Sequence, residues 1–459
     1  MSAQLYKTVF ETGGKLLSDA LAALGFDDKI SGTDNLVALN TLGFKRQEIA
    51  ALPSLTGLPK YASVRGETGI SQVTPLRTAS DATASVKEVS EGVFVLSNSQ
   101  YDVQVSGGVV TSLYDKKAKR EVIPTGEKAN QLVIFDDKPL YWQAWDVEVF
   151  HLNSRKELHA DSASTITEKG PHRVSVTTTT TISDKSSIKT TISLAAALDP
   201  DTPTYVETEA EVDWHETMKF LKVEFPVTVT NTEASYETQY GIVRRPTHYN
   251  TTWDMAKFEV CCHKWADLSE NGYGVSILND SKYGFATCGN LMRLSLLRAP
   301  KAPDAHADMG KHKFRWAILP HKGALDHRTV RSGFAFNNHI KFHSHPSVKD
   351  VTEFMNSFTF TEDSNESLIL DTIKRGEDDE DVSRGELPKR KGQSVILRVY
   401  DSLGGKSSGT IQFGPVKVAK AWKTNALEDH LEQIKVKDSG SIDIELRAFE
   451  VATYRVLLA

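Results

Sequence analysis

The sequence has few cysteines, no long apolar run and no excess of positive charge. Its 459 residues include three cysteines, Cys261, Cys262 and Cys288, and this small odd number indicates reduced thiols in a reducing compartment. The net charge of −6 excludes the basic field that attracts nucleic acid or an anionic membrane. No apolar stretch approaches the ~20 residues that span a bilayer. The first residues lack the basic and apolar regions of a signal peptide, so we expect none.

Common catalytic and metal-binding motifs are also missing. We find no Gly-x-Gly-x-x-Gly, P-loop, Gly-x-Ser-x-Gly or Cys-x-x-Cys pattern. The run Cys261-Cys262-His263 is interpreted as structural, because metal ligands are usually spaced by two or more residues. Three pairs of possible metal ligands lie two residues apart: His159 with Asp161, His306 with Asp308, and His343 with His345. Each pair supplies two ligands, whereas a metal site needs three or four. We therefore interpret the three pairs as loop or surface features.

What the sequence does contain is typical of a globular protein of two to four domains. Hydrophobic residues are 39% and charged residues 25% of the chain. Apolar residues recur at helical spacing over residues 4–24, and Gly25 ends the pattern. We therefore predict one amphipathic helix, and its apolar face requires partners because a lone helix is marginal in water.

Most of the remaining chain alternates apolar and polar residues with a period of two, which is typical of strands. The clearest examples are the ranges 101–105, 174–182, 188–194, 206–214 and 221–229. We expect 206–214 and 221–229 each to have one buried and one wet face. Gly107-Gly108 is a hairpin signal.

The last part of the chain shows the same alternation at residues 395–399 and 442–446, which predicts a small terminal sandwich. The acidic run 377–381 precedes it, and we interpret this run as a solvated loop between two β units. Many short strands without interleaved helices favour antiparallel sandwiches.

Residues 135–146 hold the densest mixture of aromatic and acidic side chains. Sugar-binding sites use flat apolar rings for the C–H faces of a pyranose, and carboxylates that accept hydrogen bonds from hydroxyls. Four of the seven tryptophans lie within two residues of an acid: Trp145, Trp214, Trp253 and Trp265. Buried tryptophans beside strand-end acids give the same pattern, so composition leaves sugar binding and core packing equally open.

Two carboxylates can hydrolyse a glycosidic bond, one as acid and the other as nucleophile or base. Asp136 and Asp137 are adjacent, so on a strand their side chains point to opposite faces and make a poor catalytic pair. Asp137 and Asp146 could act together only if the fold brings them close.

Several stretches, in order and over essentially the whole chain, resemble one family. They cover residues 39–44, 107–117, 129–148, 240–254, 263–270, 274–284 and 297–310. Together they are similar to the C-terminal region of α-mannosidases of glycoside hydrolase family 38, in particular the fungal vacuolar or cytoplasmic type.

The resemblance implies a mainly β fold: a mutarotase-like supersandwich flanked by small β-sandwich domains, with an N-terminal helix left over from a three-helix bundle. The implied domains are the end of the bundle (1–30), a small β-domain (31–90), the supersandwich (91–335) and the terminal β-sandwich (336–459). A cytoplasmic or vacuolar location is implied as well.

In this family an upstream α/β barrel supplies zinc ligands and the aspartate nucleophile. None of those motifs can be placed here, since His306 and Asp308 fall inside the C-terminal pattern. We therefore assign no catalytic residue and no metal ligand, and expect this chain alone to bind no zinc.

The implied function is a part in an α-mannosidase that hydrolyses terminal α-mannosidic bonds of oligosaccharides, with this chain inactive alone. Its expected partners are a mannose-containing oligosaccharide and the upstream catalytic barrel, with no nucleic acid or membrane and with homo-oligomerisation left open. A non-catalytic carbohydrate-binding sandwich and a structural assembly module are the alternatives. The predicted substrate-binding residues are Asp137, Trp145, Asp146, Trp253, Asp254 and Arg298.

Overall fold

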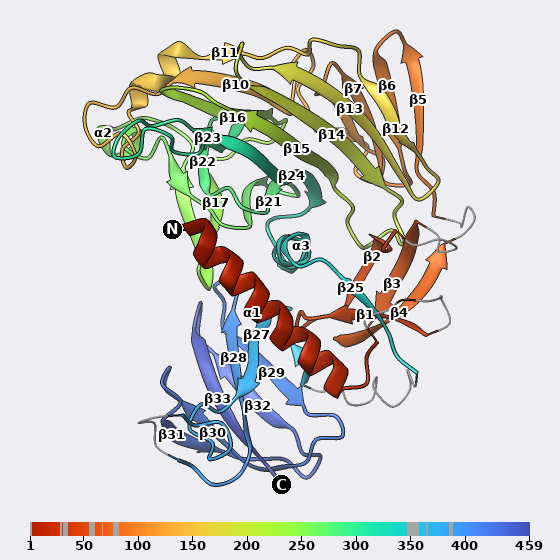
Figure 1. The fold of residues 1–459 in the computed structure, drawn as a ribbon, viewed down its shortest axis with the longest axis vertical. Helices are drawn as coiled ribbons and strands as arrows, with labels where there is room; N and C mark the ends of the chain where they lie inside the picture. The colour runs from red at the N-terminus through yellow and green to blue at the C-terminus, as the bar shows by residue number, and fades with distance from the viewer. Residues whose placement is uncertain are drawn as a thin grey trace. The chain divides into compact units, whose positions relative to one another are not determined.

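The structure is a computed structural model that describes residues 2–27, 30, 35–54, 60–66, 68–76, 82–346, 358–363, 366–384 and 389–459. The described chain is mainly β, with antiparallel sheets and one long helix at its start, which confirms the predicted fold class (Figure 1). It forms two compact units. The first unit contains residues 1–77 and 338–459, and the second contains residues 78–337. The boundaries of the four predicted domains stay a prediction.

The first unit opens with helix α1 (Ser2–Ala23), as the helical spacing predicted. The helix ends where Gly25 adopts a φ of +84°, a conformation that glycine tolerates without strain. Only its last turn is anchored, because Leu21 is buried in a cluster with Phe26, Val37 and Leu39. The apolar side chains of the preceding turns are exposed, with Phe10 74% accessible. That α1 belongs to a three-helix bundle stays a prediction.

One five-stranded antiparallel sheet follows α1. Its order is β2 (Arg46–Ala51), β3 (Tyr61–Gly66), β4 (Gly69–Leu76), β1 (Leu36–Asn40) and β25 (Lys341–Ser344). Strand β25 lies much later in the chain than β1 and pairs with it antiparallel, with Leu36 opposite Ser344. The chain thus returns to this sheet before it enters the terminal sandwich.

The terminal sandwich has two antiparallel sheets around one core. The larger sheet is β27 (Leu368–Arg375), β28 (Ser394–Asp401), β33 (Val451–Leu458), β30 (Val418–Thr424) and β31 (His430–Ile434). The smaller sheet is β26 (Thr359–Asp363), β29 (Ser407–Gln412) and β32 (Ile442–Leu446). Leu397, Ile411 and Ile444 from both sheets meet in a single cluster of buried residues, which confirms the predicted strands at 395–399 and 442–446.

The interpretation of the acidic run 377–381 as a boundary between two β units was wrong, although the run is a loop in which Glu377, Glu380 and Asp381 are exposed, as predicted. The run lies inside the terminal sandwich, between the paired strands β27 and β28. Asp379 is buried and accepts hydrogen bonds from Ser394 and from the buried Arg455. Asp378 also forms an ion pair with Arg455. Only Asp379 of the run enters the interior, where it and Asp378 balance the charge of the buried Arg455.

The described residues of the second unit form three antiparallel sheets. The first is β5 (Ser85–Ser90), β6 (Val93–Ser97), β7 (Tyr101–Ser106), β8 (Val109–Asp115) and β9 (Arg120–Glu121). The second is β11 (Lys156–Glu157), β10 (Gln131–Asp136), β16 (Lys219–Pro226), β23 (Leu291–Arg298), β22 (Gly284–Cys288) and β19 (Val260–Cys261). The third is β12 (Thr165–Lys169), β13 (Arg173–Thr181), β14 (Ser187–Ala195), β15 (Val206–Trp214), β24 (Gly310–Lys322), β21 (Tyr273–Asn279), β20 (Trp265–Glu270), β17 (Glu233–Thr238) and β18 (Gly241–Pro246).

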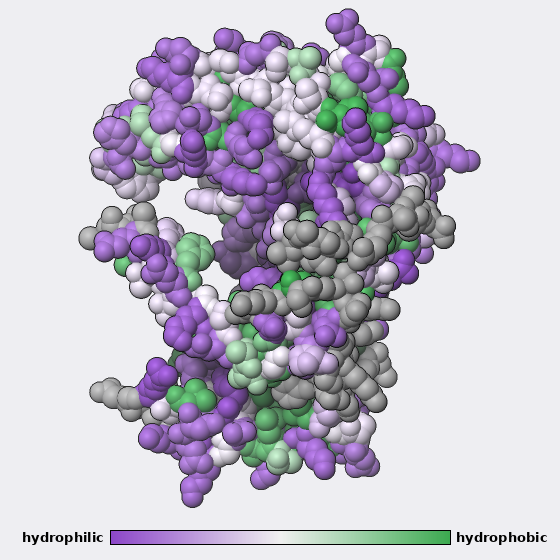
Figure 2. All heavy atoms as spheres, turned by 45° about the vertical axis from the view of Figure 1, so that its right-hand side comes forward, coloured by the Kyte–Doolittle hydropathy of each residue, from purple (hydrophilic) through white to green (hydrophobic). Residues whose placement is uncertain are grey.

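Three short helices complete the second unit: η1 (Val149–Ser154), α2 (Thr252–Met255) and α3 (His327–Asn337). The predicted hairpin at Gly107-Gly108 joins β7 to β8, and both glycines have positive φ. In β15 buried and accessible residues alternate, as predicted. None of the helices in the described ranges is both long and apolar enough to cross a membrane. The visible surface is mainly hydrophilic, with hydrophobic side chains gathered in small areas (Figure 2).

The prediction of a wet face for residues 221–229 was wrong for strand β16. Lys222 is 0% and Glu224 2% exposed. Each of these charges has a partner from another element: Lys222 pairs with Glu259, and Glu224 pairs with Arg155 and Arg293. Both faces of β16 are therefore covered, one by apolar side chains and the other by a buried set of ion pairs.

Candidate functional site

The candidate site is the loop of residues 137–146, which we call the aromatic loop, together with Arg298. The loop begins where β10 ends, and the Asp137 amide donates a hydrogen bond of 2.9 Å to the Met218 carbonyl before β16. Arg298 is the last residue of β23 and lies opposite Phe220 of β16. Its carbonyl accepts a hydrogen bond of 3.0 Å from the indole of buried Trp214. The strand ends of two sheets therefore fix Arg298 at the base of the loop.

Arg298 holds the aromatic loop at both of its ends. Its Nε donates to Oδ2 of Asp137 at 2.7 Å, and its Nη2 donates to Oδ1 at 3.1 Å. The same Nη2 lies 2.9 Å from the Gln143 carbonyl and 2.6 Å from the Asp146 carbonyl. A bidentate pair with additional carbonyl partners is a strong and directional contact. The structure thus joins Asp137, Asp146 and Arg298, three of the predicted site residues.

Asp137 and Arg298 are occupied with each other. Asp137 is 2% exposed, and burial raises the pKa of its carboxyl above the usual value in spite of the Arg298 guanidinium. A carboxylate enclosed in this way has little capacity left for a sugar hydroxyl. We therefore interpret this pair as a clamp that positions the loop.

Asp146 differs from Asp137 in being open to solvent. Within the described residues its carboxylate makes no hydrogen bond or ion pair, whereas its backbone is held by Arg298 and by a 2.9 Å bond from its amide to the Trp142 carbonyl. A fixed backbone with an unengaged carboxylate suits hydrogen bonding to a ligand hydroxyl.

The outer side of the aromatic loop is an exposed apolar ridge. Four large side chains are mostly accessible: Leu140 72%, Tyr141 75%, Trp142 70% and Trp145 67%. The Trp142 and Trp145 rings meet edge to face, with centroids 6.0 Å apart. Trp142 has a φ of +52°, a costly backbone conformation for a bulky residue. A contiguous exposed apolar patch of this kind is typical of a binding surface.

Trp253 and Asp254 lie on the short helix α2. Trp253 is 77% exposed and is available to a ligand or another protein surface. The Asp254 carboxylate accepts bonds from the Thr251 amide and hydroxyl, and Thr251 in turn accepts from the Asp254 amide, so the two form a capping box. The Asp254 side chain therefore has a structural role as part of the N-terminal cap of α2.

The four tryptophans beside acids fall into two groups. Trp145 and Trp253 are exposed, whereas Trp214 and Trp265 are 0% and 1% exposed and belong to the core. The core interpretation is therefore confirmed for Trp214 and Trp265, whereas sugar binding by the exposed Trp145 and Trp253 stays a prediction. Trp142 and Gln143 were missed as site residues, although both lie in the predicted cluster.

A buried set of charges lies beneath the aromatic loop. Lys222 Nζ is 2.5 Å from Glu259 Oε2, and its ammonium also lies 4.1 Å from the centroid of the Phe220 ring. Burial lowers the pKa of Lys222, although Glu259 opposes the shift. His151 of η1 is packed against Phe135, and its Nδ1 bonds the Glu148 carbonyl. Burial, with the nearby Lys222 charge, lowers the pKa of His151 to about 4, so this histidine is neutral at pH 7.

The described residues offer no cluster of metal ligands, and the adjacent carboxylates Asp136 and Asp137 do not form a catalytic pair. In the described ranges no group of three or more His, Cys, Asp or Glu side chains could hold a metal ion. Asp136 pairs with Lys219 and Asp137 with Arg298, so the adjacent carboxylates face different partners. The residues present do not fit the zinc site that the family resemblance implies. That this chain binds no zinc stays a prediction.

Comparisons with known proteins agree with the family resemblance. Residues 96–306 match the glycosyl hydrolases family 38 C-terminal domain, and residues 367–454 match the glycosyl hydrolases family 38 C-terminal beta sandwich domain. The chain is 44% identical to an alpha-mannosidase of Saccharomyces cerevisiae over 79% of its length and 34% of that protein. It is 38% identical to human alpha-mannosidase 2C1 over 87% of its length and 37% of that protein.

A solved structure shows the same fold. The crystal structure of an alpha-mannosidase from Enterococcus faecalis V583 superimposes with a TM-score of 0.66 at 13% identity, covering 98% of this chain and 59% of that one. The chain spans about a third of the length of the curated relatives it matches. It belongs to glycosyl hydrolase family 38 and carries the C-terminal β-rich domains of that family's α-mannosidases.

Proposed function

We propose that this chain forms part of an α-mannosidase that hydrolyses terminal α-mannosidic bonds of oligosaccharides, and that it acts together with a catalytic region outside the 459 residues. The names of the relatives support the activity, and the share of their length that the chain covers supports the need for a further region. The chain's own contribution would be to shape one side of the glycan-binding site and to stabilise the catalytic region.

The observation that carries the proposal is the clamped aromatic loop. Exposed Trp145 and Trp142 offer ring faces to the apolar side of a pyranose, while the Asp146 carboxylate accepts hydrogen bonds from its hydroxyls. The Asp137–Arg298 pair keeps the loop in one conformation and so reduces the entropy that a glycan must overcome on binding. Trp253 would add a second stacking surface.

A binding module without catalysis is the second candidate, and the same exposed ridge favours it. A mannosidase part and a non-catalytic binding module would have the same mannoside-binding loop. The two candidates therefore differ in whether the bound mannoside is hydrolysed and not in the geometry of the loop. The third, purely structural, alternative predicts no mannoside binding at all. We further propose a cytoplasmic or vacuolar location, which agrees with three cysteines that are all free thiols.

Substitution of Asp146 tests the proposal in the longer enzyme that contains this chain. Asp146→Asn should lower kcat/KM for an α-mannoside about tenfold, because a hydrogen bond to a charged acceptor is weakened. The melting temperature should stay within about 1 °C, because the Asp146 carboxylate has no partner in the described structure.

The matched control is Asp184→Asn, which neutralises another exposed aspartate in the turn between β13 and β14 of the same unit. It should leave both kcat/KM and the melting temperature unchanged. If Asp146→Asn unfolds the enzyme while the folded remainder is fully active, Asp146 is structural and its proposed role is wrong.

A further inference from the structure

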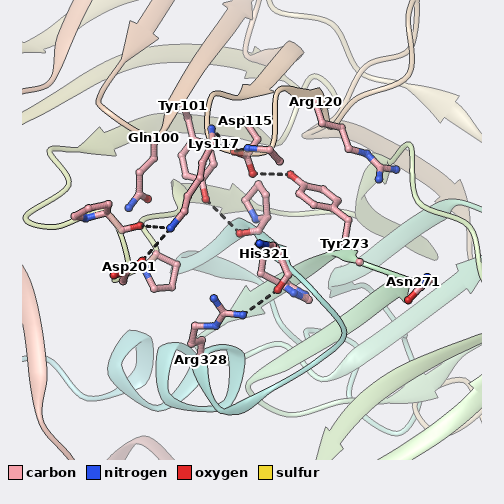
Figure 3. Close-up of a pocket in the computed structure, with 16 residues that line it drawn as sticks. Gln100, Tyr101, Asp115, Lys117, Arg120, Asp201, Asn271, Tyr273, His321 and Arg328 are labelled. Atoms are coloured by element: carbon pink, nitrogen blue, oxygen red, sulfur yellow. Dashed lines mark hydrogen bonds and ion pairs between the residues drawn. The ribbon is translucent and has the colours of Figure 1, made fainter.

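The second unit contains a cavity of about 470 Å³, lined by the start of β7, the end of β24 and the first turn of α3 (Figure 3). Three of the four Lys and Arg side chains on its lining are engaged within the protein: Arg120 with Glu270 at 2.7 Å, Arg328 with Asp326 at 2.6 Å, and Lys117 with Asp201 at 2.9 Å. The fourth, Lys322, is exposed to solvent. The cavity therefore indicates no class of ligand, in contrast to the aromatic loop.

Gln143 occupies the middle of the aromatic loop and differs from its neighbours in exposure. Residues 140–142 and 144–146 are all exposed, whereas Gln143 is partly buried. The rings of Trp142 and Trp145 on either side of it are mostly accessible to solvent. The Gln143 side chain therefore turns toward the body of the second unit while its neighbours turn outward.

The segment that follows β23 holds Gln143 through two hydrogen bonds. Gln143 Oε1 accepts a hydrogen bond of 3.0 Å from the Lys301 backbone amide. The Gln143 carbonyl accepts a second bond, of 2.9 Å, from Arg298 Nη2. The Lys301 ammonium donates to the Glu216 carbonyl at 3.0 Å, which fixes this segment in turn. Both the side chain and the backbone of Gln143 are thus tied to residues 298–301.

The backbone of the aromatic loop folds into a tight turn around Gln143. The Trp142 carbonyl accepts hydrogen bonds from the Trp145 amide at 2.7 Å and from the Asp146 amide at 2.9 Å. Trp142 has a φ of +52°, and a bulky residue keeps this conformation only where its surroundings impose it. Gln143 follows Trp142 directly, so its two bonds restrain the turn next to this costly residue.

The turn determines how the two tryptophan rings lie. The planes of Trp142 and Trp145 meet at 89°, with centroids 6.0 Å apart, so that the rings form a corner. A pyranose can place its apolar face on one ring and its edge against the other. We propose that Gln143 is a positioning residue of the mannoside-binding surface, and that its side-chain amide holds this corner in the geometry that a saccharide contacts. The inference rests on the proposed function and extends it to a residue that acts through its neighbours.

The Gln143 side chain adds a restraint that the Asp137–Arg298 clamp does not supply. The clamp holds the loop at its ends, where Arg298 meets the Asp137 carboxylate and the Asp146 carbonyl. The bond from the Lys301 amide reaches the middle of the loop instead. Loss of this bond frees the corner and leaves the clamp in place. A saccharide must then order the two rings when it binds, and this entropic cost raises KM while kcat stays unchanged.

Limited proteolysis of the whole 459-residue chain measures this restraint without any sugar. Chymotrypsin cleaves after large apolar and aromatic residues, and both tryptophans of the loop are exposed. Gln143→Ala should increase the rate of cleavage within residues 140–146 about fivefold, because a hydrogen bond that holds the loop closed is lost. Gln143→Glu keeps an oxygen that accepts from the Lys301 amide, so it should be cleaved at the wild-type rate.

Steady-state kinetics of the longer enzyme, with an α-linked mannotriose as substrate, measure the effect on the sugar. Gln143→Ala should raise KM about fivefold at unchanged kcat, and Gln143→Glu should keep KM within about twofold of the wild-type value. The matched control is Gln104→Ala. Gln104 is a partly buried glutamine of β7, in a different sheet from β10 and β23, and its amide donates to the Thr111 hydroxyl at 3.1 Å. Its removal should change neither KM nor the cleavage rate of the loop.

Faster cleavage of Gln143→Ala, a higher KM and rescue of both by Gln143→Glu would support the positioning role. Cleavage of Gln143→Ala at the wild-type rate would overturn the inference, as would equal rates for Gln143→Ala and Gln143→Glu. Faster cleavage with an unchanged KM would also overturn it, because Gln143 would then hold the loop without serving the sugar. Failure of the proposed function is distinct: the wild-type longer enzyme would hydrolyse no α-mannoside, whatever the cleavage rates, and the inference would be lost with it.

Discussion

Replacing Lys222 with methionine should lower the free energy of unfolding of the second unit by about 3–5 kcal/mol, the usual effect of stranding one partner of a buried ion pair. Methionine fills the same space along β16 but leaves the Glu259 carboxylate without its cation. The hydroxyl of Ser295 still donates to Glu259, and this bond alone cannot replace a full charge. Urea unfolding followed by tryptophan fluorescence measures the loss, because Trp214 and Trp265 are buried in this unit.

Two further variants distinguish the effect of leaving a charge buried without its partner from the effect of removing a lysine. Lys189→Met removes a similarly short ion pair, with Glu211 at 2.7 Å, but both side chains are about half exposed; the expected loss is below about 1 kcal/mol. Lys222→Met combined with Glu259→Gln should recover part of the stability, because no full charge remains buried. If Lys222→Met and Lys189→Met cost the same, the buried ion pair contributes no more than a surface pair.

The second large effect concerns helix α1. The chain should self-associate at micromolar concentration, because most of the helix's apolar side chains are open to solvent: Leu5, Tyr6, Val9, Phe10, Leu16 and Leu17. A contiguous apolar stripe of this kind promotes association, and packing against a partner would also stabilise a helix that is marginal on its own. The triple variant Tyr6→Gln, Val9→Gln and Phe10→Gln should convert the oligomer into a monomer in light scattering.

The polar side of the same helix supplies the control. Lys7→Gln with Glu11→Gln removes an exposed ion pair of 3.8 Å without changing the apolar stripe, so association should be unaffected. A wild-type chain that is monomeric at these concentrations, and stays so in the triple variant, would contradict the role given to α1.

The sequence predicts the elements of this fold better than it predicts their surroundings. Helix α1 and strand β15 follow directly from spacing, because each keeps one apolar and one polar side. Strand β16 has the same alternation, yet Lys222 and Glu224 are buried. Their partners Glu259 and Arg293 lie 37 and 69 residues away in the chain, and no local pattern reveals such a pairing.

The candidate site was only partly accessible to sequence reasoning for the same reason. The aromatic loop was found because its residues are contiguous, whereas its clamp joins Asp137 to Arg298 across 161 residues. Exposure could not be predicted either: Trp145 and Trp214 both stand beside an aspartate, and only the fold places one on the surface and the other in the core. The cavity lined by Gln100, Lys117 and His321 could not be predicted at all, since its lining comes from segments that lie far apart in the sequence.

The most direct test of the account is hydrolysis of an aryl α-mannoside by the purified 459-residue chain, with and without a metal chelator. A retaining glycosidase needs two carboxyl groups about 5 Å apart across the scissile bond, and Asp136 and Asp137 are bound to different cations. The described residues also offer no cluster of three metal ligands. We therefore expect no turnover above background in either condition. Turnover that the chelator abolishes would show that the chain carries its own catalytic centre and would contradict the account.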